Sequence, residues 1–116
     1  MAGEPNPNFM AGVPELMVLR LLQDREMYGY EIVQAIKTGT AEVISFGEGV
    51  VYPLLHSLEE DGAVTSRRKQ VGGRSRVYYA LTAKGMKRYR QLAHTWTSLA
   101  EAIQSALKGA RHAPEL

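Results

Sequence analysis

The chain has 116 residues, a formal net charge of +2 and no cysteine. These values are ordinary for one small domain, and they exclude a disulfide framework, thiol catalysis and a cysteine-based zinc site. No apolar run approaches the roughly 20 residues that a membrane span needs, and residues 1–12 lack the basic start and apolar core of a signal peptide. We therefore expect a cytoplasmic protein without a membrane partner.

The charge is distributed unevenly along the chain. Residues 1–63 contain ten acidic and three basic side chains, whereas residues 64–116 contain eleven basic side chains and only Glu101 and Glu115 as acids. The positive field is therefore localised in the second half of the sequence. Localised positive charge favours a surface that meets an anionic partner.

The first 22 residues divide into an arm and a helix. Residues 1–12 contain Pro, Gly and Asn with no apolar periodicity, which predicts a flexible N-terminal arm. Apolar residues then recur at helical spacing over residues 13–22, and Pro14 suits the first turn of a helix because that position needs no hydrogen-bond donor. The first helix is therefore expected to begin at about residue 13.

Two more helices are predicted before residue 62. Apolar residues recur at helical spacing over residues 28–36, and Gly39 stands where a C-terminal cap is expected. A third helix is predicted from about Gly47 to Glu60. Pro53 lacks a backbone donor, so it should lie in the first turns of this helix.

A basic hairpin is predicted after the third helix. Residues 63–69 and 74–81 have the composition of two strands, and residues 70–73 contain two glycines that suit a flexible tip. Five cations with no acid among them fall within ten positions: Arg67, Arg68, Lys69, Arg74 and Arg76. Three helices followed by a basic hairpin predict a winged helix-turn-helix DNA-binding domain over residues 13–81, in a fold that is mainly α.

A long final helix is predicted over residues 82–108, with Thr82 as its N-cap and residues 109–116 as a flexible tail. Apolar residues follow one another at alternating steps of three and four, as in a coiled-coil seam. The predicted dimerisation residues of this seam are Tyr89, Leu92, Trp96, Leu99 and Ile103. The alternative is that the stripe packs against the chain's own first helix, and one stripe can do both.

Several ordered motifs resemble the PadR-like transcriptional regulators over roughly residues 13–108. They are YGYEI at residues 28–32, Gly49 to Leu55, Leu58-Glu59 with Asp61-Gly62, Gly72-Gly73-Arg74 with Tyr78-Tyr79, and Leu81-Thr82 with Gly85. Val50 stands where the family favours Thr or Ser. The short length and single final helix resemble the compact branch of the family, in which some members sense drugs through a tryptophan at the place of Trp96. The resemblance implies a repressor.

The same residues favour DNA binding on physical grounds. A recognition helix enters the major groove by its N-terminal end, and a wing places cations along the adjacent phosphates. The predicted DNA contacts are Gly49, Val50 and Tyr52 in the third helix, and Lys69, Arg74 and Arg76 in the wing. Val50 could touch a thymine methyl group. For Tyr52 two interpretations stay open, namely a hydroxyl bound to phosphate or a ring packed against the second helix.

The sequence therefore predicts a homodimeric repressor on a palindromic double-stranded DNA operator, with two half-sites about one turn apart. Trp96 is either an interface anchor or part of a site for a planar, apolar or cationic effector. The alternative function is a winged-helix module that binds protein. Such a module would need an apolar or acidic wing face, and the wing here is basic.

Catalysis and cofactor binding are not indicated. The run Gly47 to Tyr52 begins like a dinucleotide-binding fingerprint but lacks the third glycine. His56 and Glu60 have helical spacing for a metal, but no third ligand is near them in sequence. Ser75 lacks the flanking glycines of a nucleophile elbow. We expect no catalytic residue, no bound metal and no cofactor.

Overall fold

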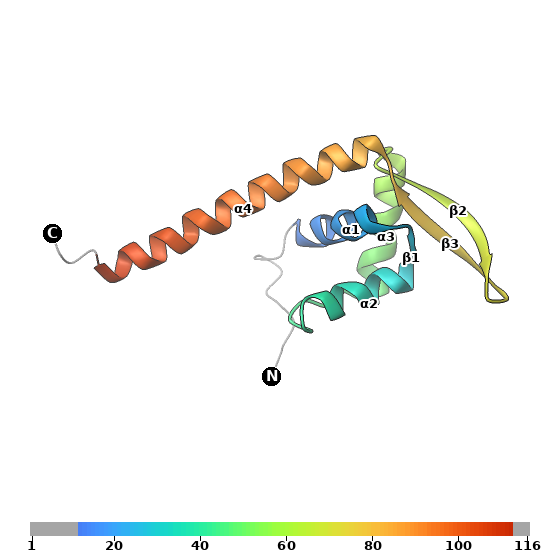
Figure 1. Cartoon of the computed structure of the whole chain (residues 1–116), viewed down its shortest axis with the longest axis horizontal. Helices are drawn as coiled ribbons and strands as arrows, with labels where there is room; N and C mark the ends of the chain where they lie inside the picture. Colours follow the sequence, from blue (N-terminus) through green and yellow to red (C-terminus); the bar gives the residue numbers. More distant parts are fainter. Residues whose placement is uncertain (1–11, 113–116) are drawn as a thin grey trace.

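The computed structural model describes residues 12–112, which form four helices and a three-stranded antiparallel sheet. The elements are α1 (Val13–Asp24), β1 (Met27–Tyr28), α2 (Gly29–Gly39), α3 (Glu48–Glu60), β2 (Val64–Val71), β3 (Arg74–Leu81) and α4 (Ala83–His112). Helices α1, α2 and α3 form a compact body, from which the β2–β3 hairpin and α4 project in opposite directions (Figure 1). The predicted winged helix-turn-helix with a long final helix is confirmed.

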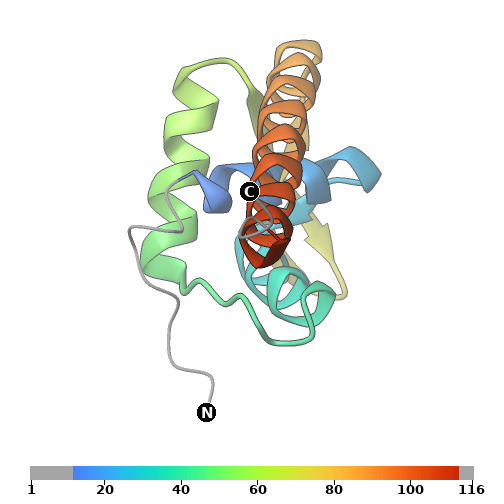
Figure 2. The ribbon, with the colours of Figure 1, turned by 90° about the vertical axis from the view of Figure 1, so that its left-hand side faces the viewer.

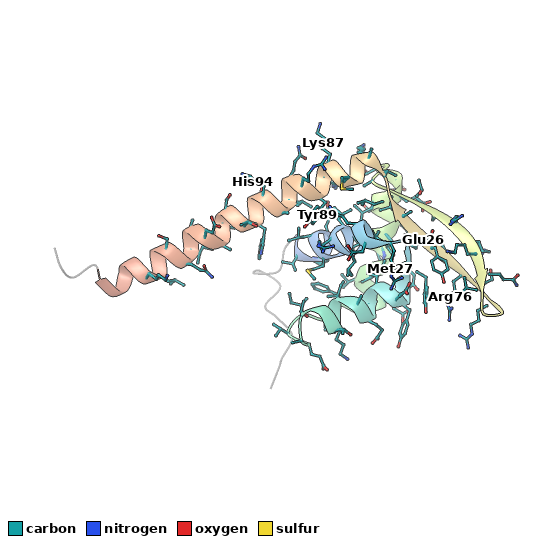
Figure 3. The ribbon with its side chains drawn as sticks, viewed as in Figure 1. Glu26, Met27, Arg76, Lys87, Tyr89 and His94 are labelled. Atoms are coloured by element: carbon teal, nitrogen blue, oxygen red, sulfur yellow. The ribbon has the colours of Figure 1, made fainter. Side chains whose placement is uncertain are left out.

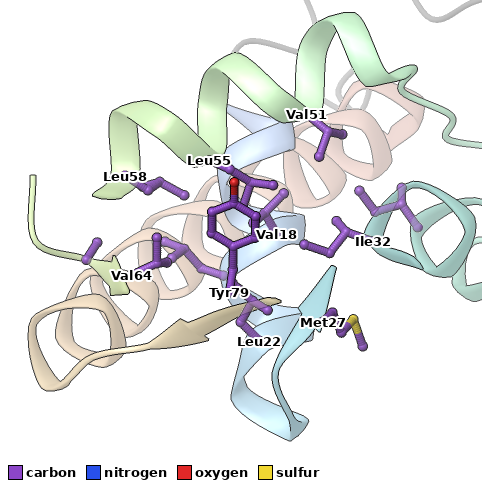
Figure 4. Packing of buried hydrophobic residues seen from close by; sticks show 12 residues of the cluster. Val18, Leu22, Met27, Ile32, Val51, Leu55, Leu58, Val64 and Tyr79 are labelled. Carbon is purple, nitrogen blue, oxygen red and sulfur yellow. The ribbon is translucent and has the colours of Figure 1, made fainter. Parts of the chain in front are cut away.

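The core lies where the apolar faces of α1, α2 and α3 meet the sheet (Figure 4). Its largest fully buried side chains are Val18, Leu19, Ile32, Ile36, Val51, Leu55, Leu58 and Val64. Burying one such side chain stabilises a fold by about 1.5–3 kcal/mol. Because three of them come from α3, this helix is fixed firmly to the body and its other face is left for contacts outside.

The sheet contains a strand that the sequence did not predict. Its order is β1-β3-β2, and Met27 and Tyr28 of β1 pair with Tyr79 and Tyr78 of β3. The hairpin was predicted, but its turn is shorter than expected, because β2 continues to Val71. The turn consists of two glycines with φ of 60° and 78°. Positive φ at both central residues is the requirement of the type I′ turn, one of the two-residue turns that match the twist of a hairpin.

The end of α2 differs from the prediction. Gly39 was expected to cap the helix, but it lies within α2 and the cap residue is Thr40. The Thr40 hydroxyl donates to the Ile36 carbonyl at 2.9 Å and accepts from the Ile44 amide at 3.0 Å. The chain then reverses through a non-glycine pair at residues 41 and 42, with φ of 50° and 66°. A side-chain hydroxyl therefore ends this helix, and glycine does not.

Helix α4 is longer than predicted. Thr82 caps it as expected, accepting a hydrogen bond from the Gly85 amide at 3.0 Å, but the helix continues past Lys108 to His112. The first part of the predicted tail is thus helical; residues 113–116 and residues 1–11 of the predicted arm lie outside the described residues. Figure 2 shows α4 foreshortened, with its C-terminal end toward the viewer and the other helices behind it.

The radius of gyration, 17.2 Å, exceeds the roughly 13 Å expected for a compact chain of this length. The excess follows from the long projecting helix, which spans about 45 Å at 1.5 Å per residue. Only the first half of α4 packs against the body, where the half-buried Tyr89 and Leu92 contact the core. The second half has no cover within the described part of the chain.

Candidate nucleic-acid interface

The N-terminal end of α3 is exposed. Val51, Leu55 and Leu58 hold one face of the helix in the core. Toward solvent, Gly49 is exposed, and a Cβ atom added to it would meet no other atom within 4 Å. The Val50 side chain keeps 44% of its surface exposed. A small residue beside an apolar one is therefore presented at the end of the helix that would enter a groove of DNA.

Tyr52 packs against the start of α2. A Cβ atom added to Gly29 would lie only 2.4 Å from Cε1 of Tyr52, so the ring rests directly on the glycine backbone. The structure therefore shows the packing interpretation of Tyr52. The ring is half-buried and also lines a groove. Packing on Gly29 therefore does not prevent the hydroxyl from contacting a phosphate, and that contact stays a prediction.

A groove of about 550 Å³ separates α3 from the wing. Its lining comes from the end of β1, the start of α2, α3 and β3: Tyr28, Gly29, Tyr30, Tyr52, His56, Arg74, Arg76, Val77 and Tyr79. Two of the predicted wing cations, Arg74 and Arg76, thus face the predicted recognition helix across one cavity. Tyrosines and arginines supply hydrogen-bond donors around it, which suits an anionic occupant.

His56 belongs to this groove, although no DNA contact was predicted for it from the sequence. It is exposed and lies one helical turn after Tyr52. Residues four apart on a helix share a face, so the signal was present in the spacing. Its chemistry adds a second polar group from α3 to the groove.

Side chains of the wing are ordered by aromatic rings. The Arg76 guanidinium lies over the Tyr28 ring, 4.3 Å from its centroid, and the Lys69 ammonium lies at the same distance from the Tyr78 ring. The two rings meet edge to face with centroids 5.4 Å apart. Electrostatic attraction to a ring face holds a cation in place and does not neutralise its charge. Arg74 has no such partner and is exposed at the tip.

The five predicted cations do not share one face of the hairpin. Lys69 pairs with Arg76 across the strands, so both point to the same side, together with Arg67 and Arg74. Arg68 points to the other side, where its Nη1 donates to the Ser75 hydroxyl at 3.3 Å. The alternation of strand side chains therefore removes one cation from the predicted cluster.

Glu26 engages two cations of this face and was not predicted. Its carboxylate accepts from Arg67 Nε at 3.3 Å and Nη2 at 2.9 Å, and from Lys69 Nζ at 2.5 Å. Hydrogen bonds from Arg67 and then Lys69 lower the pKa of Glu26 from 4.5 to about 2. Figure 3 shows Glu26 beside the base of the hairpin and Arg76 farther along it. Lys69 is thus already ion-paired, whereas Arg74 and Arg76 are not paired with any carboxylate in residues 12–112.

The apolar stripe of α4 is divided between two environments. Its inner residues, Tyr89 and Leu92, are half-buried against the body. Its outer residues are exposed: Trp96 by 42%, Leu99 by 51% and Ile103 by 50%. Hollows of about 230–340 Å³ adjoin Trp96 on several sides. The packing interpretation therefore describes the inner half of the stripe, and dimerisation through the outer half stays a prediction.

Comparison with known proteins assigns the family. Residues 18–91 match the transcriptional regulator PadR-like family. The chain belongs to this family. The transcriptional regulator Rv3488 of Mycobacterium tuberculosis is 30% identical over 90% of this chain and 92% of its own length. The transcriptional regulator YqjI of Escherichia coli is 29% identical over 88% of this chain, which spans 48% of that relative.

Solved structures agree with the family assignment. A transcriptional regulator from Clostridium thermocellum has a TM-score of 0.79 and 28% identity, covering 87% of this chain and 96% of its own. A PadR-like transcriptional regulator from Bacillus cereus has a TM-score of 0.78 and 25% identity, covering 88% and 98%. Members of the PadR-like family are DNA-binding regulators and not enzymes, which confirms the predicted class.

None of the helices within residues 12–112 combines the length and the apolar character that crossing a bilayer requires. In the same part of the chain, no three His, Asp or Glu side chains come together as metal ligands would.

Proposed function

We propose that this PadR-family regulator is a cytoplasmic homodimeric repressor that occupies a palindromic DNA operator. The observation that carries the proposal is the groove between α3 and the wing. Arg74 and Arg76 face Tyr52 and His56 across it. One cavity therefore lies between the basic strand β3 and the exposed face of α3, whose opposite face is buried in the core. A DNA backbone flanking the major groove fits this combination of cations and helix end.

Each side chain has a proposed role in the complex. Gly49 lets the backbone of α3 approach the base edges, and Val50 contacts a thymine methyl group. Arg74 and Arg76 bind phosphates, and Tyr52 adds a hydroxyl to the same backbone. Lys69 was the third predicted wing contact, and its ammonium must leave Glu26 before it can bind a phosphate.

Dimerisation is proposed through the outer half of α4. Trp96, Leu99 and Ile103 form one exposed apolar stripe, and covering it with the same stripe of a second copy is the simplest way to remove it from water. Tyr89 and Leu92 then extend the interface at its inner end. A two-fold axis at this helix presents two recognition helices to half-sites one DNA turn apart.

DNA binding is tested by fluorescence anisotropy on a labelled duplex from upstream of the protein's own gene, over several salt concentrations. If a dimer neutralises about six phosphates, the log-log slope of affinity against salt should be roughly −5. Arg74→Ala should weaken binding by about tenfold or more, because a hydrogen bond to a charged group is lost.

Arg90→Ala is the matched control, since Arg90 is an exposed cation on α4 away from the groove. It removes the same charge and should leave the affinity within about twofold of wild type. Equal loss in the two variants would mean that net charge, and not the wing, governs binding. Salt-insensitive binding by wild type would refute the proposed interface altogether.

An effector site at Trp96 is the second part of the proposal. This only tryptophan of the chain is partly exposed and adjoins apolar hollows lined by Leu16, Leu92 and Leu99. Two such indoles across a dimer axis would accept a planar cationic molecule between them. Operator release then requires only that effector and operator prefer different dimer geometries.

Trp96 fluorescence reports on this site directly. A planar cationic dye should quench the emission of wild type, and Trp96→Leu should bind the dye at least about tenfold more weakly when binding is followed by dye anisotropy. Operator affinity should fall as the dye saturates wild type. Dye binding that is equal in the two proteins would leave Trp96 as an interface anchor alone.

A further inference from the structure

Glu26 occupies a special place at the base of the wing. It belongs to the two-residue connector between α1 and β1, and its carboxylate reaches the β2 residues Arg67 and Lys69, which lie 41 and 43 positions later in the sequence. The Glu26 side chain is 23% exposed, against 68% for Arg67 and 29% for Lys69. A carboxylate fixed to the helical body thus forms ion pairs with two cations on the strand that leads to the tip.

The connector that carries Glu26 cannot move away freely. Met27, the next residue, is buried and pairs with Tyr79 of β3. Tyr28 then meets Tyr78 edge to face, and the same Tyr78 ring lies under the Lys69 ammonium. The ion pairs are therefore built on a hydrogen-bonded strand and on packed aromatic rings, which favours a defined geometry over a chance surface pair.

A phosphate would compete with Glu26 for the same donors. Sequence-independent DNA affinity arises from cations that neutralise phosphates and release counterions. Arg67 and Lys69 share a hairpin face with Arg74 and Arg76, so they lie on the side of the wing that carries the proposed phosphate contacts. While Glu26 holds them, they add little to that affinity.

We propose that Glu26 is a positioning residue that withholds Arg67 and Lys69 from DNA and so keeps the sequence-independent affinity of the wing low. The inference rests on the proposed DNA interface. It assigns the wing two kinds of cation: a pair on β3, Arg74 and Arg76, that binds phosphate, and a pair on β2, Arg67 and Lys69, that is silent in the wild-type protein.

Salt-dependent binding to a duplex of scrambled sequence tests this. Glu26→Gln should free two cations in each protomer, so the slope of a dimer should become steeper by about 3.6, at 0.9 for each added phosphate. As salt falls from about 200 to about 50 mM, the affinity of the variant relative to wild type should rise on the order of 100-fold. Glu60→Gln removes the same charge from an exposed residue that forms no ion pair within the described residues, and it should keep the wild-type slope.

A double-mutant cycle with Arg67→Ala separates withholding from a purely structural role. In wild type this change should alter DNA affinity by less than about twofold. In the Glu26→Gln background it should reduce the slope by about 1.8, because one freed cation per protomer is lost. In the same Glu26→Gln background, Arg67→Ala together with Lys69→Ala should return the slope to its wild-type value, because both freed cations are then lost, and melting curves confirm that each variant is folded.

The outcomes distinguish the inference from the proposed function. Wild type that fails to bind DNA with a salt slope would overturn the interface itself. Wild type that binds, while Glu26→Gln keeps the slope of Glu60→Gln, would overturn only the role of Glu26. Equal loss from Arg67→Ala in both backgrounds would also overturn it, since Arg67 would then bind phosphate although Glu26 is present.

Discussion

The hairpin and the outer half of α4 both project from the same helical body (Figure 1), but their surfaces differ in chemistry. The hairpin carries the cations, of which Arg67, Arg68 and Arg74 are exposed, and Arg67, Lys69 and Arg76 are held by a carboxylate or a ring. On α4 the exposed side chains include an apolar stripe, with Leu99 half exposed and Leu107 exposed by 64%. One projection is stable in water as it stands, whereas the other exposes surface that water disfavours.

The difference indicates two kinds of partner. A hydrated cation at a surface costs little free energy, so the wing needs a partner only for function. A continuous apolar stripe on a monomer instead marks an interface. We therefore expect changes on α4 to act on assembly first and on DNA second, and changes on the wing to act on DNA alone.

The largest effect is expected from Leu99→Asp. A carboxylate in the centre of the apolar stripe would have to be buried without a partner, so the dimer should dissociate. Because linked half-sites gain on the order of 10²–10⁴ in avidity, operator affinity should fall at least about 100-fold. Light scattering on a size-exclusion column and anisotropy on the same sample measure the two effects.

Ser98→Asp is the control for this prediction. Ser98 is an exposed neighbour that points away from the stripe, so the same charge placed there should leave the dimer intact. A Leu99→Asp monomer that still binds its operator with full affinity would break the proposed order of events.

Gly85→Ala should destabilise the junction from which both the hairpin and α4 project. Its effect on DNA binding should be smaller than that of losing the dimer. Gly85 lies where the hairpin meets α4, and its added Cβ would stand 2.1 Å from the Ala63 carbonyl oxygen and 2.7 Å from Cδ1 of Leu81. Overpacking of this kind costs about 1–3 kcal/mol, and the upper end is expected because one obstacle is backbone. Chemical denaturation measures the loss.

Gly109→Ala should instead raise the free energy of unfolding. Gly109 is in the exposed outer part of α4 and an added Cβ meets nothing within 4 Å. Alanine in a helix interior is more favourable than glycine by about 0.5–1 kcal/mol. Equal destabilisation by both substitutions would contradict the view that crowding at the junction is the cause.

The sequence predicted what depends on local pattern. Apolar spacing located α1, α2 and α3, and the glycine pair at residues 72 and 73 located the turn of the hairpin. Strand β1 was missed because two residues, Met27 and Tyr28, are too few for a periodic signal, and they form a strand only through their pairing with β3.

The candidate site was less predictable because its parts come together only in the fold. Arg74 and Arg76 were expected in the wing, but their shared groove with His56 depends on how α3 and β3 pack. The pairing of Lys69 with Glu26 could not be predicted either, because 43 positions separate them. Likewise, the spacing of the apolar residues of α4 does not indicate which of them the body covers and which stay exposed.

The smallest expected effect is a loss of stability in acid, which should arise at the base of the hairpin and not on α4. The pKa of Glu26 is lowered from 4.5 to about 2 by hydrogen bonds from Arg67 and Lys69. The unfolded chain therefore binds a proton that the native chain does not, and the stability contributed by Glu26 is present above about pH 4.5 and is lost as the pH falls toward 2. Wild type should lose its advantage over Glu26→Gln across this window, as followed by thermal melting at fixed ionic strength. Arg67→Ala removes the main cause of the lowered pKa and should lose less stability in acid than wild type.

The apolar stripe of α4 has no group that titrates between pH 4.5 and 2. The same pH window should therefore leave the stability difference between wild type and Gly109→Ala unchanged. Parallel curves for wild type and Glu26→Gln would instead show that the ion pairs at the base of the wing do not stabilise the protein.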